Sequence, residues 1–102
     1  MQGLFSKRRQ FILTDKPRLL YVDPEKMVLK GEIPWTDQHP ISCELVKAAT
    51  FDVLAQLTGR KYHLTSQDAD SCSLWMSLIN AALEIQKARL KAEENTLLEL
   101  VN

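Results

Sequence analysis

The sequence predicts a mainly β domain that ends in one long α-helix, and two patterns support this fold class. Before about residue 66, short apolar stretches alternate with turn residues, which is typical of antiparallel strands. From Ala69 to Leu98 there is no glycine or proline, and apolar residues recur every three or four positions, as in an amphipathic helix. A run of strands followed by one helix indicates a barrel or sandwich of two antiparallel sheets, capped by the helix.

Three strands are expected in the first third of the chain. In the first of them Arg9, Phe11 and Leu13 share one face, because successive side chains of a strand point to opposite faces. Short turns that contain proline separate the strands and predict an antiparallel meander. The expected strands are residues 7–14, 18–23 and 27–33, with turns at Asp15-Lys16-Pro17 and Asp23-Pro24-Glu25-Lys26.

The middle of the chain is expected to cross to a second sheet. Pro34 and Pro40 bracket an irregular stretch at residues 35–42. A strand is predicted at residues 50–57, although the helix-forming residues 44–49 leave its start open. Thr58-Gly59 supplies a hairpin turn, and residues 60–65 form the returning strand.

A single helix is predicted over residues 69–98, with Asp68 or Ser71 as its N-cap. Trp75 is expected in the core, where it closes one end of the barrel. The part beyond Ile85 has strong helix propensity but fewer core residues, and is expected to project. The predicted core-facing stripe contains Leu74, Leu78, Ala81, Ala82 and Ile85, widened by Trp75 and Ile79.

The charge of the chain is polarised along its length. Its 102 residues include 13 basic and 13 acidic side chains, for a formal net charge of +0. Residues 1–30 carry seven bases and three acids, whereas residues 31–102 carry six bases and ten acids. A neutral total argues against a nucleic-acid-binding protein, which usually has a basic balance.

Other function classes are also disfavoured. No apolar run approaches the roughly 18 residues that a membrane span needs, and no signal peptide is expected, because Thr14 ends the apolar run 11–13. Cys43 and Cys72 have no CxxC spacing and are expected as reduced, partly buried thiols of a cytosolic protein. They also have no metal-ligand spacing with either histidine, so neither a metal site nor a cofactor is expected.

Several segments resemble the pleckstrin-homology (PH) domain family. Residues 3–14 resemble the second strand of a PH domain and the loop before it. Tyr21-Val22-Asp23-Pro24 and residues 28–35 (VLKGEIPW) resemble more specifically the PH domains of 3-phosphoinositide-dependent protein kinases. Residues 59–64 (GRKYHL) are similar to the penultimate element of the family, and Trp75 to the tryptophan of its C-terminal helix. The resemblance covers roughly residues 3–85.

The resemblance implies a fold, a function and a setting. The fold would be seven strands in two nearly orthogonal sheets, capped by the helix. The function would be binding of phosphatidylinositol 3,4,5-trisphosphate or 3,4-bisphosphate, which brings an attached serine/threonine kinase from the cytoplasm to the plasma membrane. The kinase domain is expected upstream, since this chain shows no catalytic motif. Because only Met1 and Gln2 precede Gly3, the first strand of the family is expected to be missing, together with the bases of its loop.

The resemblance also implies five headgroup-binding residues: Lys7, Arg9, Tyr21, Lys30 and Arg60. Their chemistry suits the ligand, because a phosphomonoester carries about −1.5 to −2 charges and three acceptor oxygens. Arginine offers a planar fork to such a group and lysine a point charge. Lys7 and Arg9 are two positions apart and project from the same strand face, which continues inward as Phe11. A row that is apolar in the core and basic at its end is typical of a barrel mouth.

Simpler interpretations of the same residues stay open. Lys7, Arg9 and Lys30 also fit charged strand ends, and Tyr21 fits an ordinary core aromatic. His63 is expected as a partly buried, hydrogen-bonded residue. The remaining bases are expected as solvated charges: Arg8, Lys16, Arg18, Lys26 and Lys61.

A second function is compatible with the same fold. The chain would then be a protein-interaction or regulatory domain that binds lipid weakly or not at all. The expected loss of a strand and of the loop bases favours this alternative, because an exposed sheet edge invites dimerisation. The helix beyond Ile85 offers a further interaction surface. Nucleic-acid binding by the basic first strand is not expected, since the strand lacks paired exposed aromatics.

Overall fold

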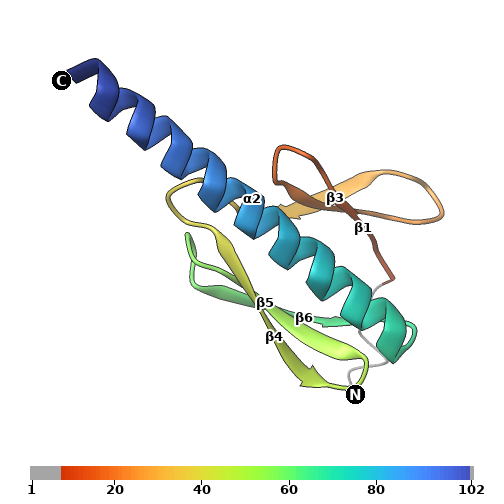
Figure 1. Ribbon diagram of the computed structural model, residues 1–102. Helices are drawn as coiled ribbons and strands as arrows, with labels where there is room; N and C mark the ends of the chain where they lie inside the picture. The colour runs from red at the N-terminus through yellow and green to blue at the C-terminus, as the bar shows by residue number, and fades with distance from the viewer. Residues whose placement is uncertain (1–7, 102) are drawn as a thin grey trace.

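Six strands and one long helix make up residues 8–101, the part of the chain that the computed structural model describes (Figure 1). In chain order they are β1 (Gln10–Leu13), β2 (Leu19–Val22), β3 (Leu29–Ile33), β4 (Ile41–Lys47), β5 (Thr50–Ala55), β6 (Arg60–Thr65) and α2 (Ala69–Val101). The predicted order, strands followed by one C-terminal helix, is confirmed. The expected loss of a first strand concerns residues 1–7, which lie outside the described part.

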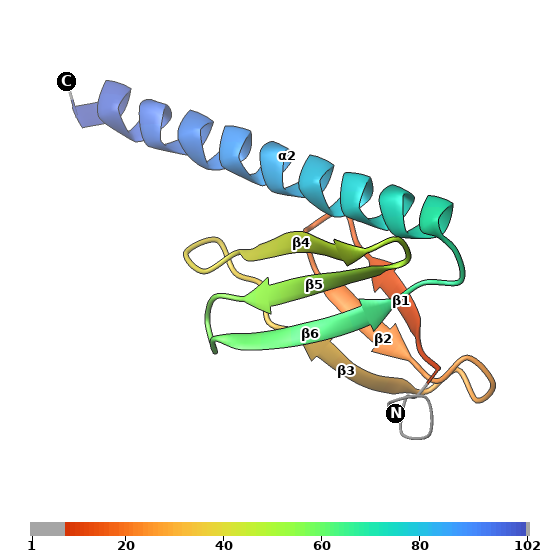
Figure 2. The same cartoon turned by 90° about the horizontal axis from the view of Figure 1, so that it is seen from below.

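The strands form two antiparallel sheets of three strands each, in the orders β1-β2-β3 and β4-β5-β6. In the first sheet Phe11 lies opposite Tyr21, and Tyr21 lies opposite Gly31. Figure 2 shows the two sheets crossing beneath α2, which packs on β4 and β5. The predicted meander and the two-sheet sandwich with a helical cap are therefore confirmed.

Side-chain hydrogen bonds close the turn between β1 and β2. Asp15 Oδ1 accepts the backbone N–H of Lys16 at 2.9 Å, and Thr14 Oγ1 accepts that of Arg18 at 3.0 Å. The Arg18 guanidinium then donates two hydrogen bonds, of 3.0 and 2.7 Å, to the carboxylate of Glu32 on β3. These hydrogen bonds raise the pKa of Arg18 and lower the pKa of Glu32. Arg18 thus joins the start of β2 to β3.

The irregular stretch predicted at residues 35–42 is wrong at its end, because β4 begins at Ile41, and the helix-forming residues 44–49, which the sequence left open, belong to this strand up to Lys47. β4 pairs with β5 from Ile41 opposite Ala55 to Lys47 opposite Thr50. Helix propensity amounts to tenths of a kcal/mol per residue, whereas β5 offers a ladder of backbone hydrogen bonds. Pairing also buries Ile41, which is 2% exposed. Tertiary pairing therefore overrides the local preference for helix.

Asp68 is the N-cap of α2, one of the two residues expected in this role. Its Oδ1 accepts the backbone N–H of Ser71 at 2.8 Å, and its carbonyl oxygen accepts that of Cys72 at 3.2 Å. An N-cap carboxylate satisfies backbone donors that have no partner within the helix. The hydrogen bond from Ser71 lowers the pKa of Asp68.

The prediction of which face of α2 is buried is wrong for four of its residues, one of which is the exposed Ala81. Leu74, Leu78 and Ile85 were expected in the core, but they are 60%, 45% and 68% exposed. Two apolar stripes run along this helix, and the one on the sheets lies roughly 120° around the axis from the exposed one, at about 100° per residue. The buried stripe contains Cys72, Trp75, Met76, Ile79, Ala82, Leu83 and Gln86.

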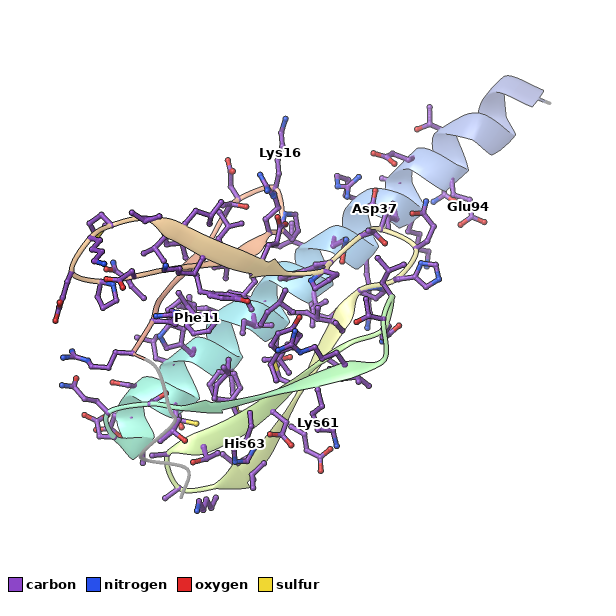
Figure 3. All side chains as sticks on the ribbon, turned by 180° about the vertical axis from the view of Figure 1, so that it is seen from behind. Phe11, Lys16, Asp37, Lys61, His63 and Glu94 are labelled. Atoms are coloured by element: carbon purple, nitrogen blue, oxygen red, sulfur yellow. The ribbon has the colours of Figure 1, made fainter. Side chains whose placement is uncertain are left out.

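The core lies between the two sheets and α2. Leu19, Ile33 and Ile79 are among its fully buried side chains. Trp75 packs against this cluster, and its ring meets Phe11 edge-on, with centroids 6.5 Å apart and planes at 75°. Figure 3 shows Phe11 pointing toward the interior beneath the helix. The expected core position of Trp75 is confirmed.

A buried hydrogen-bond network fixes α2 to the irregular segment between β3 and β4. The indole Nε1–H of Trp35 donates to Gln86 Oε1 at 3.0 Å, and both side chains are buried. Asp37 Oδ1 accepts hydrogen bonds from Gln86 Nε2 at 2.9 Å and Arg89 at 2.7 Å. These two donors lower the pKa of Asp37, which lies beside the helix in Figure 3.

The expected free thiols are found: Cys43 is half-buried and Cys72 is buried. Burial raises the pKa of Cys43 to about 11. His63 is hydrogen-bonded as expected, to Asp52 Oδ1 at 2.5 Å, but its side chain is exposed rather than partly buried, with 61% of its surface accessible. Across residues 8–101, none of the helical structure is long and apolar enough to cross a membrane.

Candidate functional site

A tight loop between β2 and β3 organises the candidate site. Asp23 Oδ1 accepts the backbone N–H groups of Glu25 at 2.9 Å and Lys26 at 3.0 Å. The carbonyl oxygen of Asp23 accepts the N–H of Met27 at 2.8 Å, and its N–H donates to Val28 at 2.9 Å. Met27 has a φ of 54°, in the left-handed region that costs a non-glycine residue roughly 1–2 kcal/mol. The Asp23 bonds hold the loop in this conformation.

Two of the sequence-predicted bases converge on this loop. The pKa of Asp23 is lowered first by the N–H groups of Lys26 and Glu25, and further by the positive charges of Arg9 and Lys30. Arg9 is half-buried just before β1, whereas Lys30 is exposed on β3. Two strands that are not paired with each other therefore bring positive charge to the same carboxylate.

Arg9 and Lys30 differ from Arg18 and Arg89 in having no carboxylate partner, a property that they share with most other bases of the described chain. Arg18 and Arg89 each hold a carboxylate at 2.7 Å, in the pairs with Glu32 and Asp37. Among residues 8–96, none of the ion pairs within 4.0 Å includes Arg9 or Lys30. One guanidinium nitrogen of Arg9 donates to the carbonyl oxygen of Arg8 at 3.0 Å, which turns the side chain along the backbone. These two charges are available to an anionic ligand.

Tyr21 lies beside this pair of bases, on β2. Its ring packs on Phe11, with centroids 5.4 Å apart, and covers Gly31, the residue that follows Lys30. A Cβ atom on Gly31 would lie 2.6 Å from the ring carbon Cζ of Tyr21, closer than real contacts allow. Glycine at this position therefore lets the tyrosine lie flat against β3.

Gly31→Ala is expected to displace the Tyr21 ring. Overpacking of this kind costs about 1–3 kcal/mol, which chemical denaturation measures directly. If Tyr21 contacts the ligand, the same variant also lowers the affinity for a soluble inositol polyphosphate, as measured by calorimetry.

Gly59→Ala is the matched control: Gly59 has a φ of 76°, and a Cβ atom at this position would have no other atom within 4 Å. It should lose stability through backbone strain and keep its affinity. Equal affinity of both variants would remove Tyr21 from the site.

Arg60, another of the predicted residues, is not brought to Asp23. Arg60 is the first residue of β6, where its guanidinium carbon lies 4.4 Å from the centre of the Tyr62 ring. The β5–β6 hairpin stands across the width of the domain from the β2–β3 loop in both ribbon views (Figures 1 and 2). A ligand bound to Arg9 and Lys30 contacts Arg60 only if it extends across the width of the domain. Lys7 lies outside the described residues, and the roles of all five residues stay predictions.

A cleft adjoins Arg9 but is not lined by Lys30, Tyr21 or Asp23. It has a volume of about 1320 Å³ and opens between the start of β1, the end of β6 and the start of α2. Phe11, Trp75 and Ile79 lie in its floor, and Arg8 and Arg9 lie at its rim. Arg8 is exposed and Arg9 is half-buried, in agreement with the predicted alternation along this strand.

Sequence reasoning missed the exposure of three apolar residues where the β2–β3 loop joins β3. Met27, Val28 and Leu29 are 62%, 50% and 60% exposed. They lie between Lys26 and Lys30, so apolar and basic side chains share one loop. A run of apolar residues directly after the turn residues was the available signal, but it was assigned to the start of a strand.

Comparisons with known proteins agree on one family. A family model described as PH domain matches residues 1–88. The chain is 67% identical over 82 residues to a probable serine/threonine-protein kinase of Dictyostelium discoideum, in a match that covers 80% of this chain and 11% of that protein. It is 39% identical over 79 residues to 3-phosphoinositide-dependent protein kinase 1 of Caenorhabditis elegans, with 78% and 12% covered. The chain thus spans about a tenth of the length of these curated relatives.

Proposed function

The chain belongs to the PH-domain family, and on that premise we propose that it binds the headgroups of 3-phosphorylated inositol lipids at a membrane surface. One observation carries this proposal. Arg9, directly before β1, and Lys30, on β3, lie on either side of β2 and its Tyr21, and they take part in none of the ion pairs within residues 8–96. A phosphomonoester is a fitting partner for them, because charge-assisted hydrogen bonds to its oxygens are about twice as strong as neutral ones.

The proposed setting is a larger protein kinase. A PH domain is a binding module, and the relatives that match it are protein kinases of which this region is a small part. We propose that this domain belongs to a serine/threonine kinase whose catalytic domain lies upstream. The kinase would be cytoplasmic until the lipid recruits it to the plasma membrane. Lys7 and Arg60 would add cations to a headgroup that extends beyond Arg9 and Lys30.

Co-sedimentation with lipid vesicles tests the proposal. Three vesicle types of matched surface charge should be used, containing phosphatidylserine, phosphatidylinositol 4,5-bisphosphate or phosphatidylinositol 3,4,5-trisphosphate. We expect the strongest binding to the trisphosphate vesicles, with lower affinity at higher salt because the contacts are electrostatic. Equal binding to all three would contradict recognition of the 3-phosphate. Binding to none would favour the second function, a protein-interaction domain.

The exposed apolar residues where the β2–β3 loop joins β3 are expected to strengthen binding to the membrane but not to the free headgroup. Val28→Ser together with Leu29→Ser should lower vesicle affinity by about tenfold, because insertion of an apolar side chain gains roughly 1.5–3 kcal/mol when it is complete. The affinity for soluble inositol 1,3,4,5-tetrakisphosphate should stay unchanged in calorimetry.

A matched control exists at the end of β4. Leu45 and Val46 are 57% and 47% exposed, close to the values for Leu29 and Val28, but they lie in the second sheet. Serine at both of these positions removes the same apolar groups and should leave vesicle binding unchanged. An equal loss in the two double variants would mean that the loop has no special contact with lipid.

A further inference from the structure

The outward side of α2 carries a second apolar stripe that no part of the described chain covers. We call it the outer stripe: Leu74, Leu78, Ala81, Ile85, Ala88 and Ala92. All six are exposed, and the three largest, Leu74, Leu78 and Ile85, are between 45% and 68% accessible. Figures 1 and 2 show that the two sheets lie along one side of the helix, so the opposite side is bare along its length.

The spacing of the outer stripe fits another helix as its partner. Its residues follow one another at intervals of four, three, four, three and four positions. This is the repeat of a coiled-coil seam, in which each side chain fits between residues of a facing helix. The seam extends over several turns of α2, well beyond the contact between the helix and the sheets.

We propose that the outer stripe pairs with the same stripe of a second copy of this chain, with the two helices antiparallel. The charges beside the seam favour this arrangement. Glu84 and Lys91 flank it on one edge, and both are exposed. A twofold axis between positions 86 and 87 places Glu84 of each copy beside Lys91 of the other. The dimer therefore contains two equivalent pairs of opposite charge. Glu84 has only a loose intrahelical partner, Lys87 at 3.7 Å, between side chains that are each 73% exposed.

The same axis gives complementary packing in the seam. Ile85 of one copy lies opposite Ala88 of the other, and Ala81 lies opposite Ala92. Each of these two pairs contains at least one alanine, which lets the two helices approach closely there. The overlap begins where Leu78 lies opposite Asn95 of the other copy and ends where Asn95 lies opposite Leu78. It covers roughly 27 Å of helix, at about 1.5 Å per residue.

The shape of the domain also favours the antiparallel direction. The sheets cover the first half of α2, and the second half projects beyond them (Figures 1 and 2). In an antiparallel pair the projecting half of each helix lies beside the covered half of the other. The two domain bodies then stand at opposite ends of the pair, whereas a parallel pair would place them side by side at one end.

Sedimentation velocity over about 1–500 μM tests the pairing, with dissociation expected on the order of tens of micromolar for so alanine-rich a seam. Ile85→Gln should leave the chain monomeric throughout. Glu84→Lys and Lys91→Glu should each weaken the dimer by about tenfold, because two attractions become repulsions. The double variant Glu84→Lys/Lys91→Glu should restore the wild-type constant within about threefold.

Lys61→Glu is the control, since it changes charge on β6, away from the helix, and should leave the dimer intact. All substituted positions are exposed, so circular dichroism should show unchanged folding. A wild-type chain that stays monomeric at every concentration overturns the proposal. So does a dimer that is insensitive to Ile85→Gln, which would point to a sheet edge. A failed rescue by the double variant would contradict the antiparallel register. If the wild-type chain is a monomer and Ile85→Gln lowers its binding to vesicles, the outer stripe binds lipid instead.

Discussion

Alanine at both Arg9 and Lys30 is expected to lower the affinity for vesicles with 3-phosphorylated lipid by about a hundredfold or more. A hydrogen bond that involves a charged group is worth about 1.5–3 kcal/mol, and the double variant removes at least two of them. Each single variant should lose about ten- to a hundredfold. Since neither base takes part in an ion pair within residues 8–96, the melting temperature should change little.

The matched control for this variant is Lys16→Ala with Lys61→Ala. Both lysines are exposed bases that point outward from the turn after β1 and from β6 (Figure 3), and their removal changes the net charge by the same amount. If binding depended on overall positive charge, the two double variants would lose affinity equally. A loss confined to Arg9 and Lys30 would locate the ligand at Asp23, whereas unchanged binding would remove both bases from the site.

Trp35→Ala is expected to cost about 3–5 kcal/mol of the free energy of unfolding, the usual range for a large buried aromatic. Trp35 is 6% exposed, and its indole N–H donates to the buried Gln86. The variant therefore leaves a cavity and also removes a hydrogen-bond donor from a buried amide. Small domains have about 5–15 kcal/mol in total, so much of the stability would be lost. Urea denaturation followed by fluorescence of the remaining Trp75 measures the change.

Trp35→Phe separates the two contributions. It keeps an aromatic ring but leaves Gln86 Oε1 without its donor, and a buried unpaired group costs about 1–3 kcal/mol. Leu57→Ala controls for the loss of an apolar side chain at the surface, where changes are usually within about 0.5 kcal/mol. A Trp35→Ala variant as stable as Leu57→Ala would show that α2 does not depend on this contact.

Much of the fold could be predicted from local signals. The turns at residues 15–17 and 23–26, and the hairpin at Gly59, have the residues that such turns require, and strands follow where expected. The N-cap at Asp68 and the absence of glycine and proline after it placed the helix. β4 was missed because its residues prefer helix and become a strand only through pairing with β5.

The candidate site was predictable in part. Alternation along the first strand indicated that Arg9 shares a face with the core residue Phe11, and the structure agrees. The convergence of Arg9 and Lys30 on Asp23 required the β2–β3 loop to fold back on itself, through backbone hydrogen bonds that no pattern of side chains displays. The separation of Arg60 from this group depends on how the second sheet crosses the first.

The order of the elements, the helix cap and the polarised charge follow directly from the sequence, because each depends on residues that are close along the chain. Which of the two apolar stripes of α2 is buried depends on long-range packing. Both stripes have helical spacing, so periodicity cannot distinguish them. The choice follows from the contacts of Gln86 with Trp35 and Asp37, which fix the rotation of the helix about its axis. That rotation leaves Leu74, Leu78 and Ile85 facing outward, available to a second helix.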